Sequence, residues 1–442
     1  MPLVRKLKWG ILLGLDIALL YLALWITLKL RYGQTFDQSV WDQHLFPFSI
    51  LFFGWLLIFY IFGLYDLRLA KNNASFYASL GKSLATAFGT AIVFFYLTPF
   101  FGIAPKTNLL LVAVLVFLLL SLWRQLYNLF IKYPLAPDDI LIIGQDAQVL
   151  ELRKHLEKNP QLGYRIFGII EPKPDALKQL LLGTPKIHRI VSAFPIHSHM
   201  EFVKFLFGYA DQFAFEHFSS LYERITDKVP LSQIDEVWFL NNLKERERNL
   251  YETGKRILDI TAGLFLALFT LLLLPIIALA IKLDSPGPLL YKQKRVGKNG
   301  KMFNLLKFRS MAENAEEAGA LWAQKNDPRI TRAGKVFRKM FLDELPQCIN
   351  ILRGEMSFIG PRPERPEFVA RLAKEIPFYH IRHIVKPGVT GWAQVNAPYG
   401  NSSQGALEKL QYELYYIKNR SFLLDLKILL KTINVIFRGG TQ

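Results

Sequence analysis

Four long apolar runs occupy the first third of the chain, at about Trp9–Leu30, Leu45–Tyr65, Leu84–Ile103 and Leu109–Phe130. Each run has roughly the ~20 residues that an α-helix needs to cross the hydrocarbon core of a bilayer. The pattern therefore predicts a four-helix transmembrane bundle over residues 1–133.

Charged residues beside these runs indicate how the bundle is oriented, because cytosolic loops of membrane proteins are enriched in Lys and Arg. Asp37 and Asp42 lie between the first two runs. Basic residues lie before the first run, between the second and third, and at the end of the fourth: Arg5, Lys6, Lys8, Arg68, Lys71, Lys82, Arg124 and Lys132. Both ends of the bundle are therefore expected in the cytosol. For Asp16, inside the first run, a hydrogen bond between helices is favoured over a functional role.

Residues 134–243 have the pattern of a small soluble domain. A short apolar strand at Ile140–Gly144 is followed by a helical stretch and by a second strand at Ile166–Ile170. This order suggests a degenerate Rossmann-like cytosolic domain. The phosphate-binding fingerprint is incomplete, because Gln145–Ala147 follow Gly144 where further glycines would be needed. A structural or regulatory role is therefore favoured over cofactor binding.

A predicted linker, 244–256, leads to a fifth apolar run, 257–283. Pro275 lies inside this run and removes a helical hydrogen bond, which bends or breaks a helix. A full crossing would place residues 284–442 outside the cell, whereas basic residues flank the run at both ends, as is typical of the cytosolic side. We expect a re-entrant membrane helix that bends at Pro275, with a kinked full crossing as the alternative.

Composition agrees with a membrane protein, since 51% of the residues are hydrophobic and 14% are aromatic. The single cysteine, Cys348, excludes an intramolecular disulfide and a thiolate zinc site within one chain. The net charge is +18, and residues 284–442 contribute +12 of it, with 26 Lys+Arg against 14 Asp+Glu. Such a surplus requires an anionic partner, such as nucleic acid, anionic lipid or a phosphorylated substrate.

The basic segment begins with a hairpin pattern. Asn299-Gly300 is a strong turn signal between two strands at about 289–295 and 302–309. Lys307 and Arg309 are two residues apart on the second strand, so they should share one face. We interpret them as phosphate ligands, with a solvated basic face as the alternative.

An acidic pair follows on a predicted helix from about Lys335 to Leu352, whose apolar residues recur at three- and four-residue steps. Asp343 and Glu344 lie beside the apolar stripe and point about 100° apart, which favours separate roles around one phosphate. Burying both acids would require compensation, for which Arg338 and a divalent cation are candidates. A solvated acidic step is the alternative.

Two further motifs suggest binding of an anionic ligand. Arg362 lies between two prolines, which restrict the backbone as a preorganised phosphate clamp requires. Gly388 and Gly391 mark a tight loop where backbone can approach a ligand closely. With Thr390 and Gln394, they form a candidate nucleotide-binding loop.

Taken together, these motifs closely resemble the large monotopic phosphoglycosyltransferases, the bacterial sugar transferase family that begins exopolysaccharide, capsule and O-antigen assembly. The resemblance covers about residues 253–442. Six motifs in the family's order carry it: Lys255-Arg256-Ile257-Leu258-Asp259, Asp284-Ser285-Pro286-Gly287-Pro288, Lys307-Phe308-Arg309-Ser310-Met311, Leu342-Asp343-Glu344-Leu345-Pro346-Gln347, Ser357-Phe358-Ile359-Gly360-Pro361-Arg362-Pro363 and Pro387-Gly388-Val389-Thr390-Gly391-Trp392-Ala393-Gln394-Val395-Asn396.

The resemblance implies an enzyme that transfers a hexose-1-phosphate from a UDP-sugar to undecaprenyl phosphate, on the cytosolic face of the bacterial inner membrane. It implies a small α+β catalytic domain over 257–442 that includes the re-entrant helix. It also implies an aspartate nucleophile and Mg²⁺, with catalysis and metal binding assigned to Asp343 and Glu344. The expected partners are the two substrates and membrane lipid, and a homo-oligomer is left open.

Two other functions fit parts of the sequence. One is a non-catalytic membrane scaffold that senses nucleotides through residues 134–243, against which the missing glycines argue. The other is a membrane-tethered nucleic-acid binder, which would need a reading helix or a stacking platform, and the sequence has neither pattern. No nucleic-acid partner is therefore expected.

Overall fold

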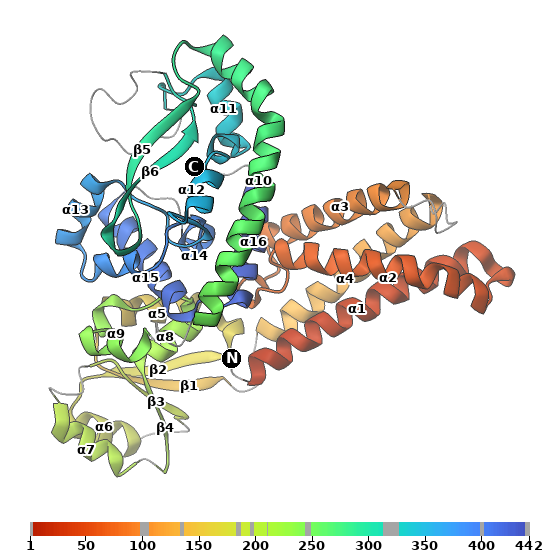
Figure 1. Cartoon of the computed structure of the whole chain (residues 1–442). Helices are drawn as coiled ribbons and strands as arrows, with labels where there is room; N and C mark the ends of the chain where they lie inside the picture. The colour runs from red at the N-terminus through yellow and green to blue at the C-terminus, as the bar shows by residue number, and fades with distance from the viewer. Residues whose placement is uncertain are drawn as a thin grey trace. The chain divides into compact units, whose positions relative to one another are not determined.

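The computed structural model describes residues 3–97, 106–132, 137–182, 187–194, 199–209, 211–243, 249–312, 327–397 and 402–437. Two compact units make up the chain, Met1–Arg224 and Ile225–Gln442 (Figure 1). Within the described residues, five helices are long and apolar enough to cross a membrane. Four of them lie in the first unit and one in the second.

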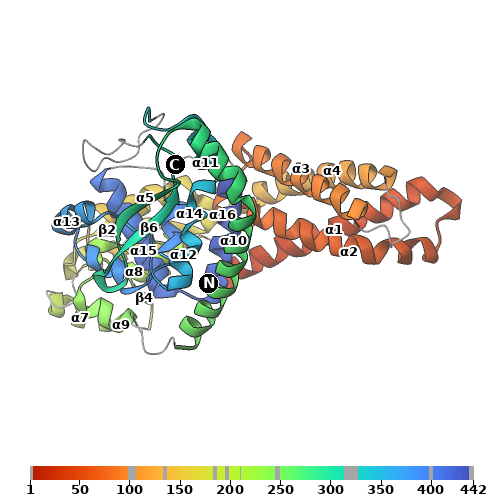
Figure 2. The same ribbon diagram turned by 45° about the horizontal axis from the view of Figure 1, so that its top comes forward.

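The first unit begins with α1 (Leu3–Tyr32), α2 (Gln38–Ile61), α3 (Ala74–Leu97) and α4 (Lys106–Lys132). Figures 1 and 2 both show these helices running side by side. They correspond to the four predicted apolar runs, although the end of the third run lies outside the described residues. One shared core of buried Leu, Phe, Trp and Ala side chains joins them.

An ion pair lies inside this bundle. Asp16 on α1 is fully buried, and Arg124 on α4 is 2% exposed and donates a hydrogen bond to the Asp16 carboxylate. Another guanidinium nitrogen of Arg124 donates to the Leu64 carbonyl at 3.1 Å. The predicted hydrogen bond between helices is confirmed, and pairing is what makes a buried acid tolerable there.

A parallel four-stranded sheet follows, in the order β2-β1-β3-β4. Its strands are β1 (Asp138–Ile143), β2 (Tyr164–Ile170), β3 (Arg189–Ser192) and β4 (Ala214–His217), and its helices are α5 (Ala147–Lys158), α6 (Pro174–Leu182), α7 (Met200–Phe207) and α8 (Phe218–Thr226). The two predicted strands are confirmed as β1 and β2. This strand order occurs in doubly wound nucleotide-binding folds, and kinship to the Rossmann fold stays a prediction.

Gly144, at the end of β1, has a structural task. Its φ is +100°, and a Cβ atom on it would lie 2.3 Å from the Ala193 carbonyl oxygen. Only glycine allows this backbone conformation at such a close approach. The geometry supports the structural interpretation of this glycine.

The second unit is dominated by α10 (Asn249–Asp284), a 36-residue helix that contains Pro275. The helix continues through the proline, and Figure 1 shows it bent towards its C-terminal end. It begins at residue 249, inside the predicted linker, whereas residues 244–248 lie outside the described residues. Most of its apolar side chains are exposed, including Phe265 at 75% and Leu272 at 74%. Re-entry into the membrane stays a prediction.

Residues 225–243, predicted as the end of the Rossmann-like domain, belong to the second compact unit. Val229 and Phe239, the latter on α9 (Glu236–Asn242), share a buried core with Tyr379 and Leu410. The units divide at Arg224, before the predicted boundary at 243, because these apolar side chains are buried in the later core.

Small elements pack around α10. The predicted hairpin is confirmed as antiparallel β5 (Leu290–Val296) and β6 (Met302–Phe308), with Asn299 and Gly300 at positive φ in the turn. Strand β7 (Ser357–Ile359) pairs in parallel with β8 (Gly388–Thr390). The other α-helices described in this part are α11 (Arg332–Lys339), α12 (Gln347–Arg353), α13 (Pro366–Glu375), α14 (Trp392–Asn396), α15 (Ser403–Asn419) and α16 (Phe422–Phe437).

Candidate active site

The acidic pair lies on a tight turn between two short helices. Helix α11 (Arg332–Lys339) ends before Phe341, which has a left-handed backbone with φ 56°. A 3₁₀ turn at Leu342–Glu344 follows, and then α12 (Gln347–Arg353). The single helix predicted from Lys335 to Leu352 is therefore wrong. Pro346 explains part of the break, because it lacks an N–H and its ring clashes with the carbonyl four residues before.

Both acids are buried on this turn. Asp343 is 2% exposed and Glu344 is 6% exposed, which rules out the solvated acidic step. Next to them, Leu345 packs in a small core with Phe308 of β6 and Ile277 of α10. The apolar side chains of the turn therefore anchor the acids between the hairpin and the long apolar helix.

Glu344 is bound by two cations. Lys307 Nζ donates to Glu344 Oε1 at 2.8 Å, and Arg362 Nη2 donates to the same oxygen at 3.1 Å. Burial alone would raise the pKa of this carboxyl, but the Lys307 ammonium and the Arg362 guanidinium outweigh it and lower the pKa to about 2. Glu344 is therefore an ionised carboxylate, and one of its oxygens is held by two cations.

Asp343 has a different environment. Its Oδ1 atom is buried, and the side chain makes no hydrogen bond among the described residues. Burial raises its pKa above the usual range, and Glu344 adds to this effect, whereas Lys307, Arg338 and Arg362 oppose it. Two neighbouring carboxyls with oppositely shifted pKa values are typical of groups with different chemical roles.

The predicted phosphate ligands are not all at the acidic pair. Arg338 donates from Nε to Ser310 Oγ at 3.0 Å and acts electrostatically on Asp343. Arg309 instead donates from Nη2 to the Ser285 carbonyl at 2.6 Å, just beyond the end of α10. Lys307 and Arg309 therefore have different partners in the structure, and phosphate binding by the two from one face stays a prediction.

The glycines of the candidate nucleotide loop serve strand packing. A Cβ atom on either Gly388 or Gly391 would lie 2.1 Å from a backbone atom of Gly360. The close neighbour is therefore protein backbone rather than the ligand we expected. Thr390 Oγ1 is 2.7 Å from a threonine hydroxyl of α16, and Gln394 donates to the Val389 carbonyl at 2.7 Å. Nucleotide binding by this loop stays a prediction.

Residues 250–439 match the family model described as bacterial sugar transferase. The chain is also 34% identical over 331 residues to the UDP-glucose:undecaprenyl-phosphate glucose-1-phosphate transferase of Escherichia coli (strain K12), covering 68% of this chain and 67% of the relative. The chain belongs to the bacterial sugar transferase family.

Another relative is more similar over a shorter stretch. The UDP-N-acetylgalactosamine-undecaprenyl-phosphate N-acetylgalactosaminephosphotransferase of Aeromonas hydrophila is 45% identical over 224 residues, or 50% of this chain. The aligned part spans about half of that relative, 52% of its length. For the undecaprenyl-phosphate glucose phosphotransferase of Komagataeibacter xylinus, the match is 44% identical over 185 residues, which are 40% of this chain and 35% of the relative.

The second unit also contains a buried ion pair that the sequence did not reveal. Arg382 donates to both carboxylate oxygens of Glu413, at 2.8 and 2.7 Å, and to the Arg362 carbonyl at 2.9 Å. It thereby supports the backbone of Arg362, which contacts Glu344. The two partners are 31 residues apart and on different elements, so no local pattern could have identified the pair.

The donor set of the candidate site fits Mg²⁺ only together with a substrate. Among the described residues, no group of three or more His, Cys, Asp or Glu could hold a metal. Asp343 and Glu344 supply two carboxylates, and the Oδ1 atom of Asp343 has no partner in the described part of the chain. Mg²⁺ is commonly bound by one or two carboxylates, with phosphates and waters completing its shell. Metal binding by this pair stays a prediction.

Proposed function

We propose that this protein transfers a hexose-1-phosphate from a UDP-sugar to undecaprenyl phosphate, and that UMP is the other product. The observation that carries the proposal is Asp343, a buried carboxylate that has no hydrogen-bond partner among the described residues and lies near the charges of Lys307, Arg338 and Arg362. The names of the Escherichia coli and Aeromonas hydrophila relatives support undecaprenyl phosphate as acceptor and a UDP-sugar as donor.

In the first step, a carboxylate oxygen of Asp343 attacks the sugar-bearing phosphorus of the donor. A new oxygen–phosphorus bond forms, and the bond from that phosphorus to the bridging oxygen breaks. UMP leaves with the electron pair, and the sugar phosphate remains on Asp343 as an acyl phosphate. No donor within the described part of the chain has to be displaced from Asp343 before it attacks.

In the second step, a phosphate oxygen of undecaprenyl phosphate attacks the same phosphorus. The bond to Asp343 breaks, the carboxylate is restored, and undecaprenyl-diphosphate-sugar is released. The exposed apolar surface of α10 beside the site offers a position for a lipid substrate. This role agrees with a helix that enters the membrane and bends, as expected for residues 257–283.

The cations stabilise negative charge during both steps. Lys307 and Arg362 neutralise Glu344 in the free enzyme, and both can share their remaining donors with substrate phosphates. Arg362 is suited to this because its side chain is 42% exposed. Mg²⁺, bound by Asp343 or Glu344 together with the donor, would further neutralise the diphosphate.

We also propose where the protein lies in the cell. Helices α1–α4 would cross the bacterial inner membrane as a four-helix bundle, with both of its ends in the cytosol, where UDP-sugars are available. The basic residues at the ends of the helices support this orientation. The second unit would then work on the cytosolic face.

An assay of UMP release from UDP-glucose and UDP-N-acetylgalactosamine, with undecaprenyl phosphate present, tests the proposal. We expect release with at least one donor, and a loss of at least about 10³-fold in Asp343→Asn, because an amide cannot act as the nucleophile. Asp175→Asn, an exposed acid at the start of α6, is the matched control and should keep full activity. Normal turnover in Asp343→Asn would disprove the role of Asp343.

A further inference from the structure

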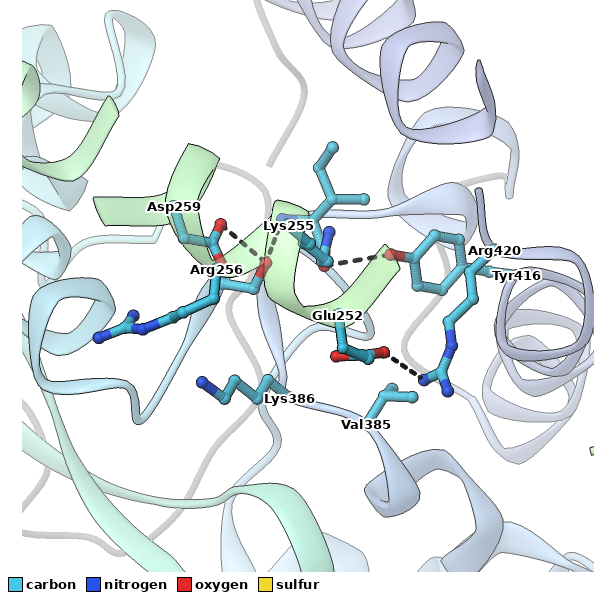
Figure 3. Close-up of a pocket in the computed structure, with 10 residues that line it drawn as sticks. Glu252, Lys255, Arg256, Asp259, Val385, Lys386, Tyr416 and Arg420 are labelled. Carbon is cyan, nitrogen blue, oxygen red and sulfur yellow. Dashed lines mark hydrogen bonds and ion pairs between the residues drawn. The ribbon is translucent and has the colours of Figure 1, made fainter. Parts of the chain in front are cut away.

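A small basic pocket lies at the N-terminal part of α10 (Figure 3). Its lining combines four cations and two acids with neutral side chains: Glu252, Lys255, Arg256, Asp259, Ser357, Ile359, Val385, Lys386, Tyr416 and Arg420. None of these residues contacts Asp343 or Glu344 among the described interactions. The cavity measures about 30 Å³, which admits a group of a few atoms and not a whole nucleotide.

Two of the four cations are neutralised by acids. Lys255 Nζ donates to Asp425 Oδ2 at 2.8 Å, and Arg420 lies 3.4 Å from the carboxylate of Glu252. The second lining acid, Asp259, accepts hydrogen bonds at 3.0 Å from Ser357 Oγ and from the Phe358 backbone N–H. These contacts join α10 to neighbouring elements and account for both acids of the pocket.

Lys386 and Arg256 have no acid in direct contact among the described residues. Arg256 donates to the Ile351 and Leu352 carbonyls of α12 at 2.7 and 2.8 Å, and these neutral acceptors do not balance its charge. Lys386 makes no hydrogen bond or ion pair among the described residues. Burial and Arg256 lower its pKa, and the charges of Asp259 and Glu252 oppose this shift only in part. In Figure 3 both side chains extend to the same side of the pocket. Both cationic groups also approach Gly354, within 3.6 Å of the position of a Cβ atom there.

Apolar surface begins directly beside these cations. Ile257 and Leu258 follow Arg256 on α10, and each is 57% exposed. At the start of α16, Leu423 is 80% exposed. A cationic pocket bordering exposed apolar side chains matches a ligand with a phosphate group and hydrocarbon chains, because basic side chains at the edge of a membrane helix attract anionic headgroups.

We propose that this pocket binds the phosphate of an anionic phospholipid headgroup, with Lys386 and Arg256 as its cationic ligands and the apolar side chains of α10 and α16 against the acyl chains. The lining of the pocket does not include Asp343 or Glu344, and the proposal does not depend on the proposed transfer reaction. Bound lipid would supply the counterion that Lys386 lacks.

Lipid binding to the full-length protein, purified in detergent and stripped of lipid, tests the proposal. Phosphatidylglycerol in mixed micelles should raise the melting temperature, whereas phosphatidylcholine should raise it less because its headgroup carries no net charge. In Lys386→Gln the affinity for phosphatidylglycerol should fall about tenfold, which corresponds to the free energy of one hydrogen bond to a charged group. Lys386→Arg should restore it, and Lys374→Gln, an exposed lysine on α13, should behave like the unchanged protein.

Two results would overturn the proposal. An equal response to phosphatidylglycerol in the unchanged protein and in Lys386→Gln would mean that the lipid acts elsewhere on the surface. Inorganic phosphate producing the same rise as phosphatidylglycerol at equal concentration would show that free phosphate, and not a lipid, occupies the pocket. Because the readout is melting temperature, neither result depends on transferase activity.

Discussion

At the scale of single residues, Asp343 and Glu344 are neighbours in sequence with opposite environments. Glu344 accepts from both Lys307 and Arg362, whereas Asp343 has no hydrogen-bond partner among the described residues. The pKa of Glu344 is therefore lowered, whereas the pKa of Asp343 is raised. This difference supports our proposal that Glu344 holds the cations in place and that Asp343 is the reactive group.

The pH dependence of the reaction should report on Asp343. A nucleophilic carboxylate must be ionised, so activity should fall as the pH drops through its raised pKa. Lys307 lowers this pKa, so Lys307→Met should raise it further and move the acid limb of the pH–rate profile to higher pH. The profile of Lys294→Met, which changes an exposed lysine on β5, should keep its acid limb. An acid limb that stays in place or moves to lower pH in Lys307→Met would contradict this account.

The buried pair of Arg382 and Glu413 should contribute strongly to stability. Arg382→Met would leave the Glu413 carboxylate buried without its partner, at a cost of about 3–5 kcal/mol in the free energy of unfolding. Arg371→Met removes the half-exposed pair with Glu375 and should cost at most about 1 kcal/mol. Denaturant unfolding of both variants measures the difference, and similar losses would show that the Arg382 pair has no special structural role.

At the scale of elements, local sequence signals predicted the hairpin and the long apolar helices because turn chemistry and hydrophobic length are local properties. The same local signals failed where contacts between distant parts of the chain determine the structure. The helix predicted from Lys335 to Leu352 is interrupted at Phe341, which has a left-handed backbone. Pro346 lies inside that predicted helix, and a proline there is a sequence signal for an interruption. The motif residues of the site could be found from sequence, but their contacts could not. Arg309 and the loop glycines Gly388 and Gly391 have backbone partners that no spacing revealed.

Helix α9 illustrates how such contacts define a unit, and its contribution is measurable. Phe239 is 7% exposed and lies 4.8 Å, between ring centroids, from Phe378. Phe239→Ala should lower the free energy of unfolding by about 3 kcal/mol or more, because it leaves a cavity in the core. The adjacent Leu240 is 80% exposed, so Leu240→Ala should have little effect. If thermal unfolding is equally affected by both changes, α9 is not part of this core.

At the scale of the whole molecule, the chain combines candidate membrane helices in both compact units with a basic second unit that belongs to the sugar transferase family. Hydrophobic length and charge predicted this organisation, because both are set by composition over long stretches. The place where the units divide was not visible, since burial of residues 225–243 depends on partners far along the chain. In our proposal, the anionic substrates bind at the acidic turn, which lies beside the apolar helix α10.

The most direct test of the central claim is to look for the covalent intermediate. The full-length protein is incubated with a UDP-sugar in the absence of undecaprenyl phosphate, digested, and analysed by mass spectrometry. We predict a peptide that carries the mass of one hexose phosphate on Asp343, and its loss when undecaprenyl phosphate is added. Product formation with an unmodified Asp343 peptide at every time point, or modification of another residue, would contradict the account.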